Sequence, residues 1–251
     1  MIDSHCHLDF EDFDKDRDDI VKSALDAGVF KIINPCSHFP SNFKVIELAK
    51  RYDNYYFSIG LHPDEASKLN GNELVEIEKL IFNDKCIAVG EIGLDYHYPD
   101  FDKQKQVDLF IAQLELAKKY NKPVIIHNRD AVTDIYDILK TYNLKGVIHC
   151  YSENVEWAKK FLDLGFFISF TGIITFKNCG QELLDVVKFI PLEKILIETD
   201  APFLAPVPFR GKLNKPEYVK YVAEKVAEIK NIVVEDVIKT TDKNVFNLFG
   251  I

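Results

Sequence analysis

The chain has 251 residues, a hydrophobic content of 47% and a formal net charge of −9 at pH 7. This length allows a large buried core, and α/β barrels commonly use such a length for a single domain. The negative charge argues against non-specific binding of duplex DNA through a basic face. It does not exclude a phosphate-containing substrate, because bound divalent cations could supply positive charge locally.

The cysteine content and the apolar runs bear on location. Five cysteines, an odd number without framework spacing in a chain too large to need disulfides, indicate reduced thiols. The longest apolar runs are long enough for strands but too short to cross a bilayer. The amino terminus is polar, so we expect no signal peptide and a cytoplasmic protein without a membrane segment.

Short apolar, β-branched segments recur along the chain and predict strands. The eight predicted strands are residues 1–7, 30–36, 55–61, 87–94, 124–128, 146–149, 166–170 and 195–199. Amphipathic stretches predict helices between them, at residues 16–27, 41–52, 73–83, 102–120, 131–142, 153–164 and 181–189, with a last helical region at 215–249.

The alternation of these elements predicts the fold class. Eight strands that alternate with eight helical regions are typical of a closed parallel (β/α)8 TIM barrel, here formed by residues 1–251 as one domain. A doubly wound open sheet is the alternative, but such sheets usually have about five to seven strands. No linker or internal repeat divides the chain.

The histidines lie at one end of this expected barrel. Each of the seven falls at or just beyond the carboxyl end of a predicted strand: His5, His7, His38, His62, His97, His127 and His149. A barrel of this type carries its active site at that end. In an extended segment, alternation would send the first two imidazoles to the same face.

Two carboxylates complete the predicted site. Glu91 lies near the end of the fourth predicted strand, between Gly90 and Gly93. Asp200 ends the eighth strand. Four imidazoles and two carboxylates at one barrel mouth are more ligands than one tetrahedral zinc ion uses. They favour two divalent ions, Zn²⁺, Mn²⁺ or Mg²⁺, that share a bridging carboxylate and a bridging water.

Several motifs occur in a characteristic order: DSHCH (3–7), GEIGLDY (90–96), PVIIHNRDA (123–131), VIHCYS (147–152) and IETDAP (197–202). With these motifs the sequence resembles the TatD-type metal-dependent deoxyribonucleases of the amidohydrolase-like barrel superfamily. IGLHPD (59–64) and RGKLNKP (210–216) also fit, so the resemblance runs from residue 2 to the carboxyl terminus. It implies a (β/α)8 barrel that hydrolyses phosphodiester bonds of DNA, as an exonuclease on single strands, with two divalent metal ions per chain.

The resemblance also implies roles for single residues. His5, His7, Glu91 and Asp200 would hold the first metal ion, and Glu91, as the bridge, would hold the second ion together with His127 and His149. Many amidohydrolases bridge their ions with a carboxylated lysine instead. Here the nearest lysine, Lys85, precedes the fourth strand, which favours the nuclease branch over lactonases and amidases.

Asp200 is the predicted catalytic residue, because a carboxylate that contacts both metal and water can act as general base. The candidate substrate contacts are His62, Arg129, Arg210 and Lys212. The last two follow strand eight and could clamp a phosphate, although a solvated loop is the alternative. His62 could contact substrate or cap its own loop, and His38 and His97 are expected to be loop residues.

Two further groups of side chains carry weaker expectations. Tyr96, Tyr98 and Phe101 could stack on a base or pack beneath their loop. Asp3 and Glu198 should point into the barrel below the metal ligands, where a buried acid could orient a ligand imidazole.

The functional alternatives remain metal-dependent hydrolases of another substrate, such as an aminoacyl-tRNA deacylase or a lactonase, since two metal ions attack a carbonyl equally well. A metal-binding protein without catalytic activity fits less well, because the predicted site residues include a positioned base. The expected partner is single-stranded DNA or another phosphodiester, with no membrane and no obligate protein partner.

Overall fold

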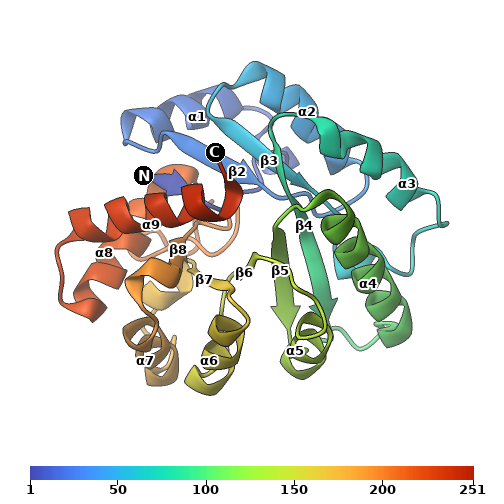
Figure 1. Cartoon of the computed structure of the whole chain (residues 1–251). Helices are drawn as coiled ribbons and strands as arrows, with labels where there is room; N and C mark the ends of the chain where they lie inside the picture. Colours follow the sequence, from blue (N-terminus) through green and yellow to red (C-terminus); the bar gives the residue numbers. More distant parts are fainter.

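The structure, a computed structural model, describes all residues from Met1 to Ile251. Eight parallel strands form one sheet in sequential order (Figure 1). They are β1 (Ile2–Asp3), β2 (Lys31–Asn34), β3 (Tyr55–Ile59), β4 (Cys86–Asp95), β5 (Val124–Arg129), β6 (Gly146–Ile148), β7 (Phe167–Phe170) and β8 (Ile195–Ile197). The sheet closes beyond β1 and β8 through a parallel bridge between Cys6 and Ala201. The chain is a (β/α)8 barrel, as predicted, and the open-sheet alternative is excluded.

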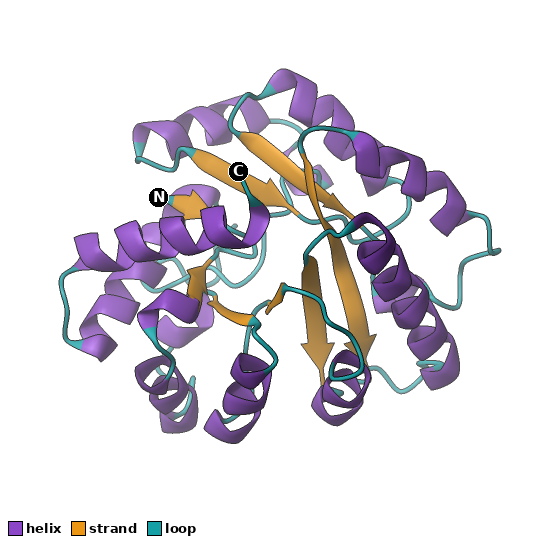
Figure 2. Cartoon of the chain, in the orientation of Figure 1, coloured by secondary structure: helices purple, strands orange, loops and turns teal.

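Helices surround the strands on the outside of the barrel (Figure 2). They are α1 (Arg17–Asp26), α2 (Ser41–Arg51), α3 (Glu73–Glu78), α4 (Lys103–Tyr120), α5 (Val132–Leu139), α6 (Val155–Asp163), α7 (Gln181–Phe189), α8 (Val219–Lys230) and α9 (Val234–Phe249). The main core, a cluster of 50 buried residues, draws its side chains from both strands and helices and so seals the two layers together.

The last helical region of the prediction is two α-helices rather than one. The first, α8, ends because Asn231 adopts a left-handed conformation (φ 54°), and its N–H bonds back to the last turn of the helix. In the second, α9, Val245, Leu248 and Phe249 pack against side chains from six different strands, including Ile2. Side chains of so many strands meet only inside a barrel, so α9 covers its amino-terminal end and leaves the carboxyl end for a site.

Regular pairing in β1 is much shorter than predicted. It covers only Ile2–Asp3, and the histidines that follow lie between this pair and the isolated bridge at Cys6. Backbone hydrogen bonds from Ser4, His7 and Asp200 still tie this segment to the end of β8 and to the residues that follow it. The amino-terminal histidines are therefore placed by closure of the barrel, not by a long strand.

The segment around Glu91 is irregular. The pairing of β4 with β5 shifts register between Val89 and Ile92. At Gly93 (φ 150°), an added Cβ would lie 1.9 Å from the carbonyl oxygen of His127. Only glycine permits this close approach, which brings β4 and β5 together beside Glu91.

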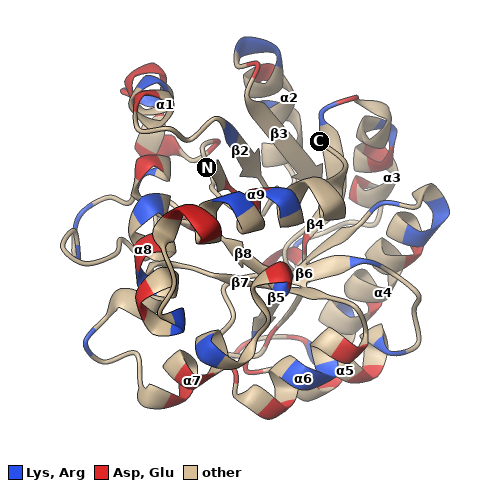
Figure 3. Ribbon diagram, turned by 60° about the vertical axis from the view of Figure 1, so that its left-hand side comes forward, with Lys and Arg blue, Asp and Glu red and all other residues tan.

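Charges of both signs occur side by side on outer helices such as α1 and α9 (Figure 3). The helices include none that combines the length and the apolar composition needed to span a membrane.

Candidate metal centre

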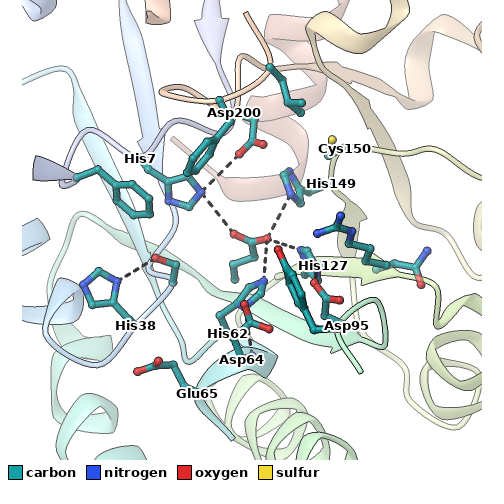
Figure 4. A pocket seen from close by; sticks show the side chains of 18 of the residues that line it. His7, His38, His62, Asp64, Glu65, Asp95, His127, His149, Cys150 and Asp200 are labelled. Atoms are coloured by element: carbon teal, nitrogen blue, oxygen red, sulfur yellow. Dashed lines mark hydrogen bonds and ion pairs between the residues drawn. The ribbon is translucent and has the colours of Figure 1, made fainter. Parts of the chain in front are cut away.

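A cavity of about 700 Å³ opens at the carboxyl ends of the strands (Figure 4). Five of the six predicted metal ligands line it: His7, Glu91, His127, His149 and Asp200. The sixth, His5, is fully buried beneath them, and its ring stacks on that of His149 with the ring centres 3.7 Å apart. The structure thus brings all six side chains together at the end of the barrel where a site was expected.

The first group of polar atoms gathers around the amino-terminal histidines. The Nε2 atoms of His5 and His7 are 3.2 Å apart. Oε2 of Glu91 lies 3.4 and 3.6 Å from these two nitrogens. Oδ1 of Asp200 lies 3.6 and 3.5 Å from them. Four potential ligand atoms therefore converge on one point.

The second group lies on the other side of Glu91. Its Oε1 atom is 2.8 Å from Nδ1 of His127 and 3.3 Å from Nε2 of His149. Glu91 thus turns one carboxylate oxygen to each group of imidazoles, as a bridging carboxylate does.

The electrostatics of the centre favour positive charge. Burial raises the pKa of Glu91, but the charges of His149 and His5 outweigh it and hold that pKa well below its usual range. Burial lowers the pKa of His127, but hydrogen bonds to Asp95 and Glu91 outweigh it and raise that pKa to about 9. Such a centre keeps its carboxylates ionised and attracts a cation to its imidazoles.

These residues fit divalent metal ions by their chemistry as well as by their placement. In each of two trios the ligand atoms lie within 4.8 Å of one another: His5, His7 and Asp200, and Glu91, His127 and His149. Imidazole nitrogen combined with carboxylate oxygen is the donor set that zinc and related divalent ions use in hydrolases.

Asp200 depends on an unusual backbone conformation. Its φ of 55° lies in the left-handed region, which aspartate tolerates better than most residues. Its N–H donates to the carbonyl oxygen of His5 at 2.9 Å, and its own carbonyl accepts from the N–H of Phe203. The carboxylate is thereby held over the cavity by the junction of the first and last barrel segments.

The two buried acids, Glu198 and Asp3, make different contacts. Oε1 of Glu198 accepts hydrogen bonds from Nδ1 of His149 at 2.9 Å and from the N–H of Cys150 at 2.7 Å, so its predicted contact with an imidazole of the site is confirmed. Asp3 instead accepts from the N–H and Oγ1 of Thr199, at 2.9 and 2.6 Å. Its predicted role as an imidazole partner is wrong, because the barrel closure uses its carboxylate.

Asp95 was not among the predicted site residues. Its side chain is buried at the end of β4, and Oδ2 lies 3.1 Å from Nε2 of His127. The sequence held a signal for it, since strand alternation places Asp95 on the same face as Glu91 and Gly93.

The candidate substrate contacts divide into those inside and those outside the cavity. His62 lines it, with Nε2 3.9 Å from Oε1 of Glu91, while its Nδ1 accepts a hydrogen bond from the N–H of Asp64. The interpretation of His62 as a loop cap is confirmed, and its contact with substrate stays a prediction that its place in the cavity wall allows. Arg129 also lines the cavity, and its guanidinium lies 5.4 Å from the ring centre of Tyr98.

Arg210 and Lys212 do not line this cavity, contrary to the expectation from their position in sequence. The guanidinium of Arg210 lies over the ring of Phe176, 3.7 Å from its centre, beside a separate hollow of about 330 Å³. The loop after β8 is long enough to carry both side chains away from Asp200.

Other residues of the cavity wall were missed or only partly foreseen. Tyr98 lines the cavity, whereas Tyr96 and Phe101 stack on each other with their ring centres 4.6 Å apart. Lys68 and Phe203 also line it and were not predicted. No motif marked these two, because their loops come close only in the folded barrel.

The remaining histidines and Lys85 take loop and structural positions. His38 lines the rim and bonds to Ser37, while the half-exposed His97 pairs with Asp130. Nζ of Lys85 donates to backbone carbonyls at the end of α2, at 2.7 and 2.8 Å. It therefore contributes nothing to the cavity.

Comparison with known proteins identifies the family. The family model described as TatD related DNase matches residues 2–250. This chain belongs to the TatD family. An uncharacterized metal-dependent hydrolase of Bacillus subtilis, YabD, is 40% identical, with 100% of this chain and 99% of the relative covered. Its counterpart YcfH of Escherichia coli is 41% identical over 100% of this chain and 96% of the relative.

A solved structure agrees with the family and the fold. The crystal structure of YjjV, a TatD homologue from Escherichia coli, superposes with a TM-score of 0.95 at 33% sequence identity. The match covers 100% of this chain and 98% of that one. The resemblance seen in the motifs is therefore confirmed over the whole barrel.

Proposed function

We propose that this chain is a metal-dependent hydrolase that cleaves phosphodiester bonds of DNA, acting as an exonuclease on single strands. The family supports hydrolysis: the matching model is described as a DNase, and the relatives at 40 and 41% identity are named metal-dependent hydrolases. The single-strand preference and the exonuclease mode rest on the resemblance and on the cavity wall.

The observation that carries the proposal is the position of Glu91. Its two carboxylate oxygens face two separate groups of imidazole nitrogens, at 3.4–3.6 Å on one side and 2.8–3.3 Å on the other. A single metal ion would leave one of these groups unused. We infer a centre for two ions, with Glu91 as the bridge.

Different residues of the chain would hold the two metal ions. His5, His7 and Asp200 would hold one ion with Glu91, and two further imidazoles, His127 and His149, would hold the other. When bound, the two cations would neutralise charge on the phosphodiester and lower the pKa of a water molecule between them.

Asp200 would act as general base and accept a proton from the attacking water. Its Oδ1 faces the imidazoles of His5 and His7, which leaves the other oxygen free for that proton. Burial raises the pKa of Asp200. The hydrogen bond with His7 and the charges of the nearby imidazoles lower it by a larger amount, so the pKa lies below its usual value. Asp200 is therefore ionised at neutral pH.

The cavity wall supports a single-stranded substrate. Tyr98 and Phe203 line the cavity with 54% and 50% of their surfaces exposed. An exposed aromatic ring of this kind can stack on an unpaired base, which a duplex does not offer. Arg129 adds positive charge at the same wall and would bind the phosphate backbone. Lys68 also lines the cavity, where it pairs with Glu65 at 2.8 Å.

The test combines metal analysis with a substrate panel. Protein purified without chelator is analysed for metal and assayed on single strands labelled at the 3′ or the 5′ end, matched duplexes, an aminoacylated RNA and lactones. Each assay is repeated after chelation and dialysis, and again after addition of Mn²⁺, Mg²⁺ or Zn²⁺. We expect stepwise release of nucleotides from single strands, loss of this activity on chelation and its return with metal.

Other outcomes contradict the proposal. Full activity in excess chelator would exclude the metal centre. Hydrolysis of the aminoacyl ester or a lactone without cleavage of DNA would assign the same centre to an esterase or amidohydrolase.

A further inference from the structure

Asp95 lies at the proposed second metal site. Neither the motifs nor the family description assigns a role to it. Asp95 is 3% exposed, and its Oδ2 atom lies 3.1 Å from Nε2 of His127. The other nitrogen of that ring, Nδ1, lies 2.8 Å from Oε1 of Glu91. His127 thus stands between two carboxylates, with Glu91 at Nδ1 and Asp95 at Nε2, and Figure 4 shows Asp95 beside the ring of His127.

We propose that Asp95 is a positioning residue that fixes His127 with its proton on Nε2 and so makes Nδ1 the metal-binding atom. The proposal rests on the proposed metal centre. A ligand imidazole commonly donates its second N–H to a carboxylate, which sets the tautomer and makes the free nitrogen a stronger donor to metal.

Hydrogen bonds fix both the backbone and the side chain of Asp95. The side-chain amide of Gln106, on α4, bonds to both the N–H and the carbonyl oxygen of Asp95, at 2.9 and 2.8 Å. Oδ1 of Asp95 accepts from the N–H of His97 at 3.0 Å. Only Oδ2 is left for His127, so the backbone and the rotamer of Asp95 are both fixed before any metal binds.

The second imidazole of the site has a matching partner. Glu198 accepts from Nδ1 of His149 at 2.9 Å, which leaves Nε2 toward Oε1 of Glu91. With metal bound, the two imidazoles would therefore hold opposite tautomers, His127 binding through Nδ1 and His149 through Nε2.

The first metal site is built differently. Nδ1 of His5 and Nδ1 of His7 are both buried and have no hydrogen-bond partner in the chain. Loss of Asp95 should consequently affect the second ion and spare the first.

A different role for Asp95 makes a different prediction. Ligand atoms of His62, Asp95 and His127 also lie within 4.8 Å of one another, which is close enough to hold an ion themselves. An ion there would need Nε2 of His127, the atom that the positioning role protonates. The two roles are mutually exclusive at that nitrogen.

The variant test uses Asp95→Asn with Asp64→Asn as its matched control. Two N–H groups, of His97 and His127, point at the two oxygens of Asp95, and an asparagine has only one oxygen to offer them. We expect isothermal titration with Zn²⁺ to show two ions in the wild type, with the affinity of the second lowered about 10- to 100-fold in Asp95→Asn. Asp64 lines the same cavity but contacts His62 only, so its variant loses equal charge and should bind both ions as the wild type does.

The direct test needs no variant. Long-range ¹H–¹⁵N correlation spectra of the Zn²⁺-loaded wild type should show His127 protonated at Nε2 with Nδ1 bound to metal, and His149 the reverse. These spectra also decide the matter if Asp95→Asn fails to fold.

The outcomes separate this inference from the proposed function. A wild type that binds no ion overturns the metal centre itself. A wild type with two ions, and an Asp95→Asn variant with unchanged affinities, overturns only the role of Asp95. Three ions in the wild type, or metal on Nε2 of His127, would make Asp95 a ligand instead of a positioning residue.

Discussion

The substitution Asp200→Asn separates metal binding from proton transfer at the proposed centre. Asparagine keeps a carbonyl oxygen for the first ion, in place of the Oδ1 atom that faces His5 and His7, but its amide is not a useful base. Asparagine also tolerates the left-handed backbone that position 200 requires (φ 55°), so the barrel should fold normally. A loss of turnover that remains at saturating metal therefore reports on chemistry.

The expected loss follows from the worth of a positioned general base. Turnover at saturating metal should fall about 10²- to 10⁴-fold, which corresponds to about 3 to 5 kcal/mol in the activation barrier. The first ion should bind more weakly because one negative charge is lost, whereas the second ion, which does not contact Asp200, should be retained.

The assay is kcat on a 3′- or 5′-labelled single strand across a metal titration, with bound metal measured in parallel. Asp130→Asn is the matched control: Asp130 has the same φ of 55°, but it pairs with the half-exposed His97 and does not line the cavity. Near wild-type turnover of Asp200→Asn in excess metal would refute the reasoning and make Asp200 a ligand only.

Four further substitutions test other parts of the site. His127→Ala should lose the second ion but keep the base, so excess metal should restore part of its turnover, unlike that of Asp200→Asn. Arg129→Ala should raise KM for single-stranded DNA at low salt, where contacts to phosphate are strongest, without changing metal content. Phe203→Ala should raise KM by about 5- to 160-fold, which corresponds to the free energy of one base stacked on an aromatic ring. Gly93→Ala should lower the free energy of unfolding in urea by about 2 to 6 kcal/mol, because a strained backbone and an overpacked contact add together.

Each of these has a control and a contradicting result. Phe189→Ala removes a ring of similar exposure (46%, against 50% for Phe203) that does not line the cavity, and Gly28→Ala places a Cβ at positive φ with nothing within 4 Å. Arg51→Ala removes a surface cation paired with Asp18. A control variant with the same effect as its test variant would contradict the prediction made for that residue. Full recovery of turnover by both Asp200→Asn and His127→Ala in excess metal would contradict the distinction between base and ligand.

The sequence by itself determined the fold class and the six central residues. Alternation of β-branched segments with amphipathic ones specifies a parallel barrel, because each pattern buries apolar surface only in its own geometry. The same alternation placed the histidines at strand ends, and the barrel brings all strand ends to one rim. Glu198 was predicted in the same way, from sharing a face with Asp200.

The tertiary structure alone decided what surrounds those residues. Asp3 shares a face with the ligand histidines, yet its carboxylate bonds to Thr199, since closure of the barrel brings that partner nearer than any imidazole. Arg210 follows Asp200 closely in sequence, but its long loop carries it to Phe176. Lys68 reaches the cavity from a different loop. Such positions depend on how loops fold over the rim, and a single sequence carries no periodic signal for contacts between segments that meet only after the barrel has closed.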